Sequence, residues 1–204
     1  MDAIIYFNMK HRITSNKDYT HITFKEISGL KATYTEIDFV SCVFKNCNFS
    51  ESEFNICKFE ECKFEDCNFN LAKFPKTRLL DCSFKECKLT GIDWNNINTI
   101  LGLKMNVEGC DMSYSMFEKL DLSGSYFINN KIHEVDFRQC NLNKVVFKGS
   151  NLTRTRFDRS DLSESDFRKA KNYFFDPGQV KCKKARFDSP EVLNLLKAFN
   201  VIIE

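Results

Sequence analysis

Large apolar side chains recur at every fifth residue through most of this 204-residue chain, in a first run from Tyr34 to Trp94. Five residues advance an α-helix by ~500°, so the large side chains would not stay on one side of a helix. In a flat strand every second one would point outward. The period therefore predicts a coil that turns a corner every five residues and points one large side chain inward from each side. The members of the run between its two ends are Phe39, Phe44, Phe49, Phe54, Phe59, Phe64, Phe69, Phe74, Leu79, Phe84 and Leu89.

A second run begins at Val107 in a phase that differs by three residues from the first, which predicts an insertion from Asn95 to Lys104. We expect five segments along the chain. These are an irregular N-terminal cap (1–33), the first run (34–94), an interruption (95–106), the second run (107–170), and a loop, last partial coil and C-terminal cap (171–204). The second run continues through Met112, Phe117, Leu122, Phe127, Ile132, Phe137, Leu142, Phe147, Leu152, Phe157, Leu162 and Phe167.

Small residues precede the large ones by two positions, and nine of the ten cysteines occupy this position. Free cysteine packs as a small apolar residue, so we interpret these nine as inert core thiols. A metal site or a redox function is the alternative. Disulfides between stacked cysteines are disfavoured because their Cβ vectors would run parallel. Only Cys182, at the edge of a loop, is expected to be accessible.

The second run also carries a short signature of a small residue, Asn or Asp, Leu or Phe, and Ser or Thr. Over residues 34 to 187 the chain resembles the pentapeptide-repeat proteins. This resemblance implies an all-β solenoid, a right-handed quadrilateral β-helix in which four five-residue sides form one coil. The segments that carry it are Asn141-Leu142-Asn143, Ser150-Asn151-Leu152-Thr153 and Ser160-Asp161-Leu162-Ser163.

If four sides close one coil, residues twenty apart stack along the axis at ~4.8 Å. The large side chains then form inward columns, and close packing requires their volumes to compensate within each layer. The expected core columns are Phe24, Phe44, Phe64 and Phe84; Phe117, Phe137 and Phe157; Phe127, Phe147, Phe167 and Phe187; and Leu122, Leu142 and Leu162.

The C-terminal segment predicts a short α-helical cap. Asp188 or Ser189 is suited to the N-cap position, and Pro190 to the first turn. We expect an apolar face of Val192, Leu195, Leu196 and Phe199 to cover the open end of the coil, followed by a strand at residues 201–203. Two interpretations remain: a monomeric cap or a homodimer interface. Resemblance to the quinolone-resistance members, which pair through a similar helix and strand, favours the dimer. Its expected interface residues are Leu195, Leu196, Phe199, Val201, Ile202 and Ile203.

Composition excludes several classes of function. The chain has three histidines and no phosphate-binding glycine loop, nucleophile elbow or paired-carboxylate motif, so we expect no enzyme, no metal site and no cofactor. No apolar run reaches the ~18 residues of a membrane span, and no signal peptide begins the chain, so we expect a cytoplasmic protein without a membrane partner. The net charge of +2 does not indicate direct nucleic-acid binding.

Two functions remain as hypotheses. The first is a protein-interaction scaffold whose target is not assigned. The second is implied by the resemblance: quinolone-resistance members are rods that mimic DNA and engage DNA gyrase or topoisomerase IV, a type II topoisomerase partner. DNA mimicry requires a strongly negative surface. Here the segment from Lys144 to Lys169 is locally basic, and the candidate acidic strip comprises only Glu61, Asp66, Asp81 and Glu86.

Overall fold

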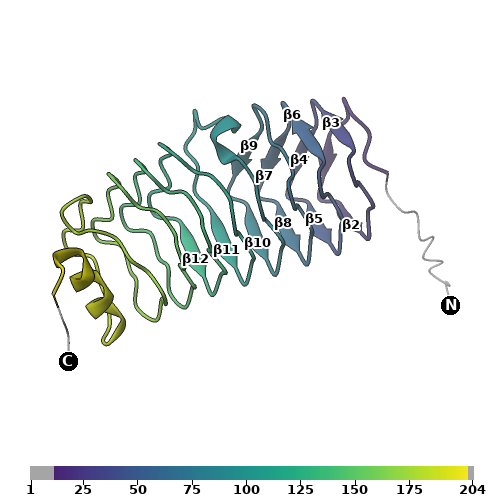
Figure 1. The fold of residues 1–204 in the computed structure, drawn as a ribbon. Helices are drawn as coiled ribbons and strands as arrows, with labels where there is room; N and C mark the ends of the chain where they lie inside the picture. Colours follow the sequence, from purple (N-terminus) through teal and green to yellow (C-terminus); the bar gives the residue numbers. More distant parts are fainter. Residues whose placement is uncertain (1–11, 202–204) are drawn as a thin grey trace.

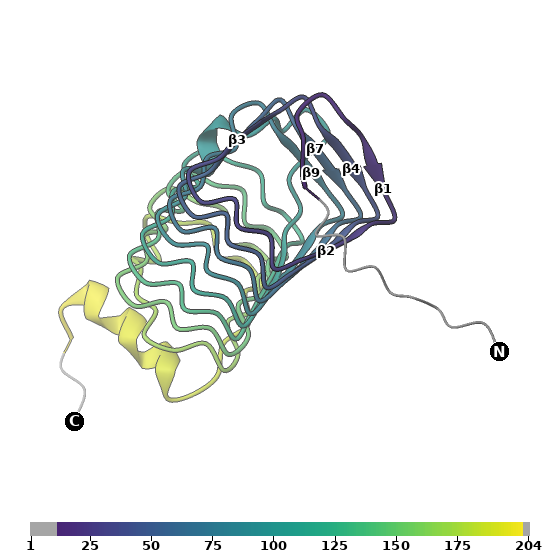
Figure 2. The same cartoon turned by 90° about the vertical axis from the view of Figure 1, so that its right-hand side faces the viewer.

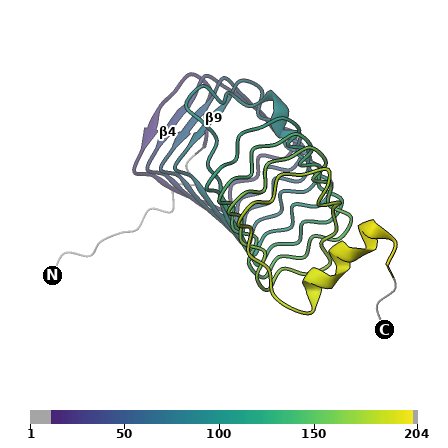
Figure 3. The same cartoon turned by 90° about the vertical axis from the view of Figure 1, so that its left-hand side faces the viewer.

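The computed structural model describes residues 12–201, which form an elongated parallel β-solenoid with four sides (Figure 1). Successive coils lie on one another and enclose a common interior (Figure 2). The opposite view shows the helix near the C-terminus lying at one end of the rod (Figure 3). The elements are β1 (Tyr19–Thr20), β2 (Thr23–Lys25), β3 (Thr33–Thr35), β4 (Asp38–Val40), β5 (Val43–Lys45), β6 (Glu53–Asn55), β7 (Lys58–Glu60), β8 (Lys63–Glu65), β9 (Arg78–Leu80), β10 (Ser83–Lys85), η1 (Trp94–Asn96), β11 (Asn106–Glu108), β12 (Tyr126–Ile128) and η2 (Glu191–Phe199).

Four faces can be followed from coil to coil, and parallel backbone pairing holds each of them together. Face A contains β1, β4, β7 and β9, and face B contains β2, β5, β8, β10, β11 and β12. Face C consists of single bridges from Ser28 to Lys171. Face D contains β3 and β6 and continues through bridges at Met116, Asp136 and Arg156. The strands are short because each side of a coil has only five residues to span it.

The large inward side chains pair across neighbouring coils with a register of twenty residues. Phe44 lies opposite Phe64 and Phe64 opposite Phe84, with ring centroids 4.9 and 4.7 Å apart. Two further columns repeat the arrangement on faces D and B: Phe117, Phe137 and Phe157, and Phe127, Phe147 and Phe167. All nine rings are at most 2% exposed. Burial of these rings supplies a large part of the hydrophobic stabilisation, because each aromatic side chain removes ~150–250 Å² from water.

The register changes once, across the segment between η1 and β11. Phe84 lies opposite Val107, 23 residues later, and the register of twenty returns between Val107 and Phe127. Regular backbone hydrogen bonds to the neighbouring coils are made by Asn98 on one side of the break and by Met105 on the other. The three additional residues therefore lie between these two positions and leave the coils on either side in regular pairing.

Most corners of the coil place one residue in the left-handed backbone region, two positions after the large inward side chain. Glu61 and Asp66 are examples, with φ of 54° and 53°. This conformation is unfavourable for residues other than glycine, and the chain has only seven glycines. The corner N–H groups of Glu61 and Asp66 donate to the Leu80 and Lys85 carbonyls of the next coil, at 2.9 and 3.0 Å. Pairing with the neighbouring coil thus compensates for the backbone strain.

The small inward residues have a polar function in addition to filling space. Thr77 Oγ1 donates to the Phe54 carbonyl at 2.7 Å and accepts from the Cys57 N–H at 3.0 Å. Ser150 and Ser160 bridge backbone groups in the same way. A buried backbone donor or acceptor without a partner is costly. The hydroxyl at this position therefore satisfies groups that the short strands leave unpaired.

All ten cysteines are free; nine of them are buried and Cys182 is half-buried. Burial is the largest cause that raises the pKa of Cys57 to about 11 and that of Cys140 to about 12. The Cys140 thiol donates to the Phe117 carbonyl at 2.7 Å. These groups are protonated packing residues rather than reactive thiolates.

The C-terminal helix η2 differs from the sequence expectation, since it is a 3₁₀ helix. Neither Asp188 nor Ser189 caps it: the N-cap residue is Pro190, which makes no side-chain capping bond, and the Asp188 carboxylate accepts from the Lys169 N–H at 2.9 Å. With three residues per turn, residues three apart lie above one another. The face predicted for an α-helix is therefore divided between different sides of η2.

Candidate interaction surface

The described residues contain no group of three or more His, Cys, Asp or Glu side chains able to hold a metal ion. Of the histidines, His21 is exposed and His133 lies 3.4 Å from Glu134, while His11 is outside the described residues. None of the described helices is long and apolar enough to cross a membrane.

A groove with a volume of about 620 Å³ lies on face D, just before the break in the repeat. Leu71 is half-exposed and lies against Gly91, where an added Cβ would come within 2.6 Å of Leu71 Cδ2. Gly91 also has φ of +66°, so a larger residue would meet both strain and a clash. The other lining residues are Glu51, Glu53, Ala72, Lys73, Phe74, Pro75, Asp93 and Asn96. The groove thus has an apolar floor and a mixed, mainly acidic rim.

A short turn at residues 99–102 follows the helix η1, which is the teal helical segment at the upper edge of the rod (Figure 1). Ile100 is 85% exposed and Leu101 is 62% exposed. The turn is held by the Gly102 N–H donating to the Thr99 carbonyl at 2.8 Å and by the Ile100 N–H donating to Asn98 Oδ1 at 3.1 Å. Two large apolar side chains are therefore presented to solvent on an ordered backbone.

On the other side of the break, exposed Tyr114 and Met116 extend the apolar character of this region. Met116 forms a backbone β-bridge with Asp93 in the adjacent coil, and Asp93 is one of the residues that line the groove. We call the groove, the turn at residues 99–102 and these two side chains the break surface. Its exposed apolar residues are Leu71, Ile100, Leu101, Tyr114 and Met116.

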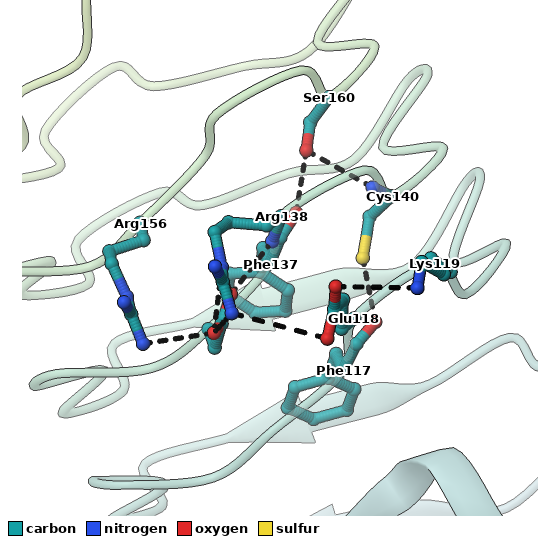
Figure 4. Close-up of polar contacts among 9 residues, drawn as sticks. Phe117, Glu118, Lys119, Phe137, Arg138, Cys140, Arg156 and Ser160 are labelled. Carbon is teal, nitrogen blue, oxygen red and sulfur yellow. Dashed lines mark hydrogen bonds and ion pairs between the residues drawn. The ribbon is translucent and has the colours of Figure 1, made fainter.

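Face D continues beyond Met116 into a cluster of charged side chains. Arg138 Nη2 and Arg156 Nη2 lie 2.8 and 3.0 Å from the same carboxylate oxygen, Oδ2 of Asp136. Figure 4 shows the side chains of the two arginines converging. Arg138 also lies 4.0 Å from Glu118. Burial tends to raise the pKa of Asp136, but hydrogen bonds from Arg138 and the charge of Arg156 lower it overall. Asp136 is thus a satisfied ionised anchor that orients two arginines, rather than a free catalytic carboxylate.

The candidate acidic strip occupies corners on both sides of face B. Glu61 and Asp81 lie at one corner and Asp66 and Glu86 at the other, all with positive φ. Glu61 accepts from Ser41 at 2.7 Å. Face B between the two rows carries lysines, which include Lys45 at 2.7 Å from Glu65, and also Lys63 and Lys85. The four carboxylates are therefore split by cations and do not form a continuous negative surface.

The residues expected at the dimer interface differ in their burial. Only Leu195 is buried, with half-buried Val192 beside it against the core, whereas Leu196, Phe199 and Val201 are exposed. In a 3₁₀ helix Leu193, Leu196 and Phe199 form one row, and all three are exposed. Leu196 and Phe199 therefore do not cover the coil end. Ile202 and Ile203 lie outside the described residues.

Four parallel faces of five-residue sides, closed around columns of Phe and Leu, define a pentapeptide-repeat solenoid. The profile of the pentapeptide repeat region matches residues 37–101 and 103–171, and the chain belongs to this family. No curated protein matches the chain significantly.

Solved structures show the same fold. The pentapeptide repeat protein HetL, involved in heterocyst differentiation regulation in the cyanobacterium Nostoc sp. strain PCC 7120, is 13% identical, with a TM-score of 0.61 over 84% of this chain and 86% of that one. A trypsin-treated form of QnrB1, a plasmid-mediated fluoroquinolone resistance protein, is 14% identical, with a TM-score of 0.54 over 92% of this chain and 97% of that one. At these identities the likeness concerns the fold alone.

The five-residue period predicts the core columns but does not indicate the break surface as a unit. The period of five placed an insertion between Asn95 and Lys104, yet Ile100 and Leu101 were not distinguishable from buried residues by composition. Leu71 occupies a corner position of the repeat, and the sequence pattern does not indicate that its side chain is exposed. Only the exposed fractions of these side chains identify them.

Proposed function

We propose that this protein is a non-catalytic scaffold that binds a partner protein through the break surface. The observation that carries the proposal is the turn at residues 99–102, which presents Ile100 and Leu101 at 85% and 62% exposure on a hydrogen-bonded backbone. Exposed apolar groups with a polar rim are typical of protein interfaces. An ordered turn loses little conformational entropy when a partner binds. The groove next to it supplies a concave seat.

Affinity purification after cross-linking in cells, with quantitative mass spectrometry, tests this proposal through a pair of variants. Ile100→Asp with Leu101→Asp should abolish capture of the partners bound by the wild-type chain. Leu30→Asp with Ile56→Asp is the matched control, because both residues are exposed apolar positions in the first coils. If the two double variants retain the same partners, the break surface is not the binding site.

A second candidate is binding to a type II topoisomerase. Its support is the fold shared with QnrB1 over most of both chains. The mixed charge around the acidic corners does not favour it, since lysines of face B separate the carboxylates. Supercoiling by purified DNA gyrase, with and without ciprofloxacin, decides the matter. If this protein neither inhibits nor protects the enzyme across a titration, gyrase is excluded as the target.

We also propose a homodimer through η2. The exposed row of Leu193, Leu196 and Phe199, continued by Val201, supports it, because an apolar row of this kind is unfavourable in water. A two-fold contact would pair the row with itself. For the compartment, ten free thiols suit the reducing conditions of a cytoplasm.

A further inference from the structure

Because a solenoid advances along its axis as the chain advances, segregation of charge in the sequence becomes segregation along the rod. Residues 138–186 contain 13 Lys and Arg against five Asp and Glu, whereas residues 12–137 contain 15 against 19. The 49 residues from 138 to 186 correspond to about 2.5 coils, or roughly 12 Å of rod at ~4.8 Å per coil. The net charge of +2 therefore conceals a strongly cationic C-terminal part of the rod.

Most of these cations are not neutralised within the molecule. Arg138, Arg154, Arg156 and Arg168 form ion pairs with Asp or Glu. The other nine form no ion pair with any described residue, and all are exposed: Lys144, Lys148, Arg159, Lys169, Lys171, Lys181, Lys183, Lys184 and Arg186. Two of the nine nevertheless act on a carboxylate through their charge: Lys181 helps to lower the pKa of Asp161, and Arg186 helps to lower that of Asp166.

The free cations are densest at the corner between faces A and B. Lys144 and Lys184 occupy left-handed corner positions in the same row, two coils apart, and the carboxylate residue Glu164 lies between them; all three have φ of 59°. Lys181 pairs with Asp161 through a backbone β-bridge on face A, and Arg186 pairs with Asp166 in the same way on face B. The last coil therefore places cations on both sides of this corner. We call the corner with its two flanking strips, formed by Lys144, Lys148, Lys181, Lys183, Lys184 and Arg186, the basic corner.

We propose that the basic corner binds the phosphate backbone of a duplex nucleic acid without sequence specificity. Duplex DNA carries one negative charge per ~1.7 Å, or about seven phosphates over ~12 Å, which is of the same order as the six cations of the basic corner. Five of the six side chains are lysines, which bind phosphate as compact point charges without the fixed geometry of an arginine fork, as binding without sequence specificity requires. This assignment differs from the sequence expectation of no nucleic-acid contact, which rested on the balanced total charge.

An anionic membrane is disfavoured by what surrounds the basic corner. The exposed large apolar residue between 138 and 186 is Phe174 alone among the described residues, and it does not belong to the basic corner. Peripheral helices that lie on membranes combine cations with inserted apolar side chains. The basic corner shares no residue with the break surface, so this inference stands independently of the proposed scaffold function.

Fluorescence anisotropy with the full chain and a fluorescein-labelled duplex of about 20 base pairs, at about 50 and 200 mM salt, tests the proposal. Wild type should bind at the lower salt, with affinity falling steeply at the higher. The variant K144E/K183E/K184E should weaken binding at least tenfold and reduce the salt slope by about 0.9 for each phosphate that is no longer neutralised. The control K25E/K76E/K88E makes the same charge change at exposed lysines in the N-terminal half of the rod and should retain most of the affinity. Melting curves verify that both variants fold.

Three results would overturn the assignment. Absence of duplex binding at the lower salt would remove it. Equal weakening by the two triple variants would show that net charge, rather than the basic corner, governs binding. Binding to polyglutamate, or to vesicles with about 30% phosphatidylserine, but not to the duplex would assign the corner to an acidic protein or a membrane instead.

Discussion

Trp94 stacks on Phe117 with ring centroids 5.7 Å apart and planes 15° from parallel, although the regular register is broken between them. The contact joins two columns that the sequence pattern treats as separate. Phe74 precedes Trp94 at 5.2 Å, and Phe137 follows Phe117 at 5.0 Å. The three additional residues are thus excluded from the core and appear at the surface as the turn with Ile100 and Leu101.

Truncation of this column at the break should be as costly as truncation within a regular run. We expect Phe117→Ala and Phe64→Ala each to lower the free energy of unfolding by ~3–5 kcal/mol, because each leaves a cavity in a close-packed interior. Trp94→Phe should cost less than ~1.5 kcal/mol, since Trp94 Nε1 is buried without a hydrogen-bond partner among the described residues. Urea unfolding followed by circular dichroism measures all three. A loss below ~1 kcal/mol for both alanine variants would contradict the stacked register.

The bridging hydroxyl of Thr77 offers a test of the polar function of the small inward position. Thr77→Val keeps the shape but leaves the Phe54 carbonyl and the Cys57 N–H without this partner. We expect a loss of ~1–3 kcal/mol in the free energy of unfolding. Thr153→Val is the control, since its hydroxyl bonds only to Asn151 at the surface, and should change stability by less than ~0.5 kcal/mol. Equal effects in both would show that volume alone matters at position 77.

Native cysteine alkylation should label Cys182 and spare the buried thiols. With the pKa of Cys57 at about 11 and that of Cys140 at about 12, both remain protonated and inaccessible near neutral pH. Their raised values also imply that stability is fully present below the unfolded thiol pKa of ~8.5 and falls as pH rises from there toward 11. Mass spectrometry after brief exposure to iodoacetamide checks the labelling, with Cys182→Ser as the control. Rapid modification of Cys47, Cys62 or Cys67 would contradict their core placement.

The ion pairs of Asp136 should make a pH-dependent contribution to the free energy of unfolding. Asp136→Asn removes the acceptor shared by Arg138 and Arg156 and should cost ~1.5–3 kcal/mol near neutral pH. The pKa of Asp136 is lowered in the folded state, so the contribution is present above the unfolded value of ~3.9 and is lost as pH falls below it. Unfolding at about pH 7 and about pH 3 should therefore show a difference that shrinks in acid. As a control, Asp158→Asn at an exposed carboxylate should cost less than ~0.5 kcal/mol near neutral pH.

The assembly can be tested on the exposed row of η2. Leu196→Asp with Phe199→Asp should convert a dimer to a folded monomer, because neither side chain is needed to cover the coil end. Light scattering gives the mass, and a melting curve shows that the fold persists. An unchanged dimer would place the interface elsewhere, and a monomeric wild type would end the proposal. Leu195→Asp should instead destabilise the fold, since Leu195 is buried.

Much of the fold follows from the period alone, because five residues per side with one large inward side chain leave few arrangements of the backbone. Phe44, Phe64 and Phe84 can be assigned to one column from the sequence once four sides are assumed for each coil. The corner conformation was not predictable in the same way. Glu61 has no local preference for positive φ, and it adopts this conformation because the next coil accepts its N–H group.

The C-terminal cap shows the opposite case. The spacing of Val192, Leu195, Leu196 and Phe199 suits an α-helix, yet the chain forms a 3₁₀ helix that buries only part of this set. Short helices depend on tertiary packing for most of their stability, so local spacing does not decide their geometry. Tertiary packing also decides the exposure of the side chains of Ile100 and Leu101 at the break, since both residues resemble core residues in the sequence.

The five-residue period predicts the solenoid, its inward columns, the place of its interruption and the axial separation of charge, because a repeat maps position in the chain directly onto position along the rod. Packing between coils sets which apolar residues reach the solvent, which backbone groups Thr77 and Ser150 satisfy, and how Trp94 meets Phe117 across the break. Those outcomes depend on contacts between neighbouring coils, some twenty residues apart, and no local pattern specifies them.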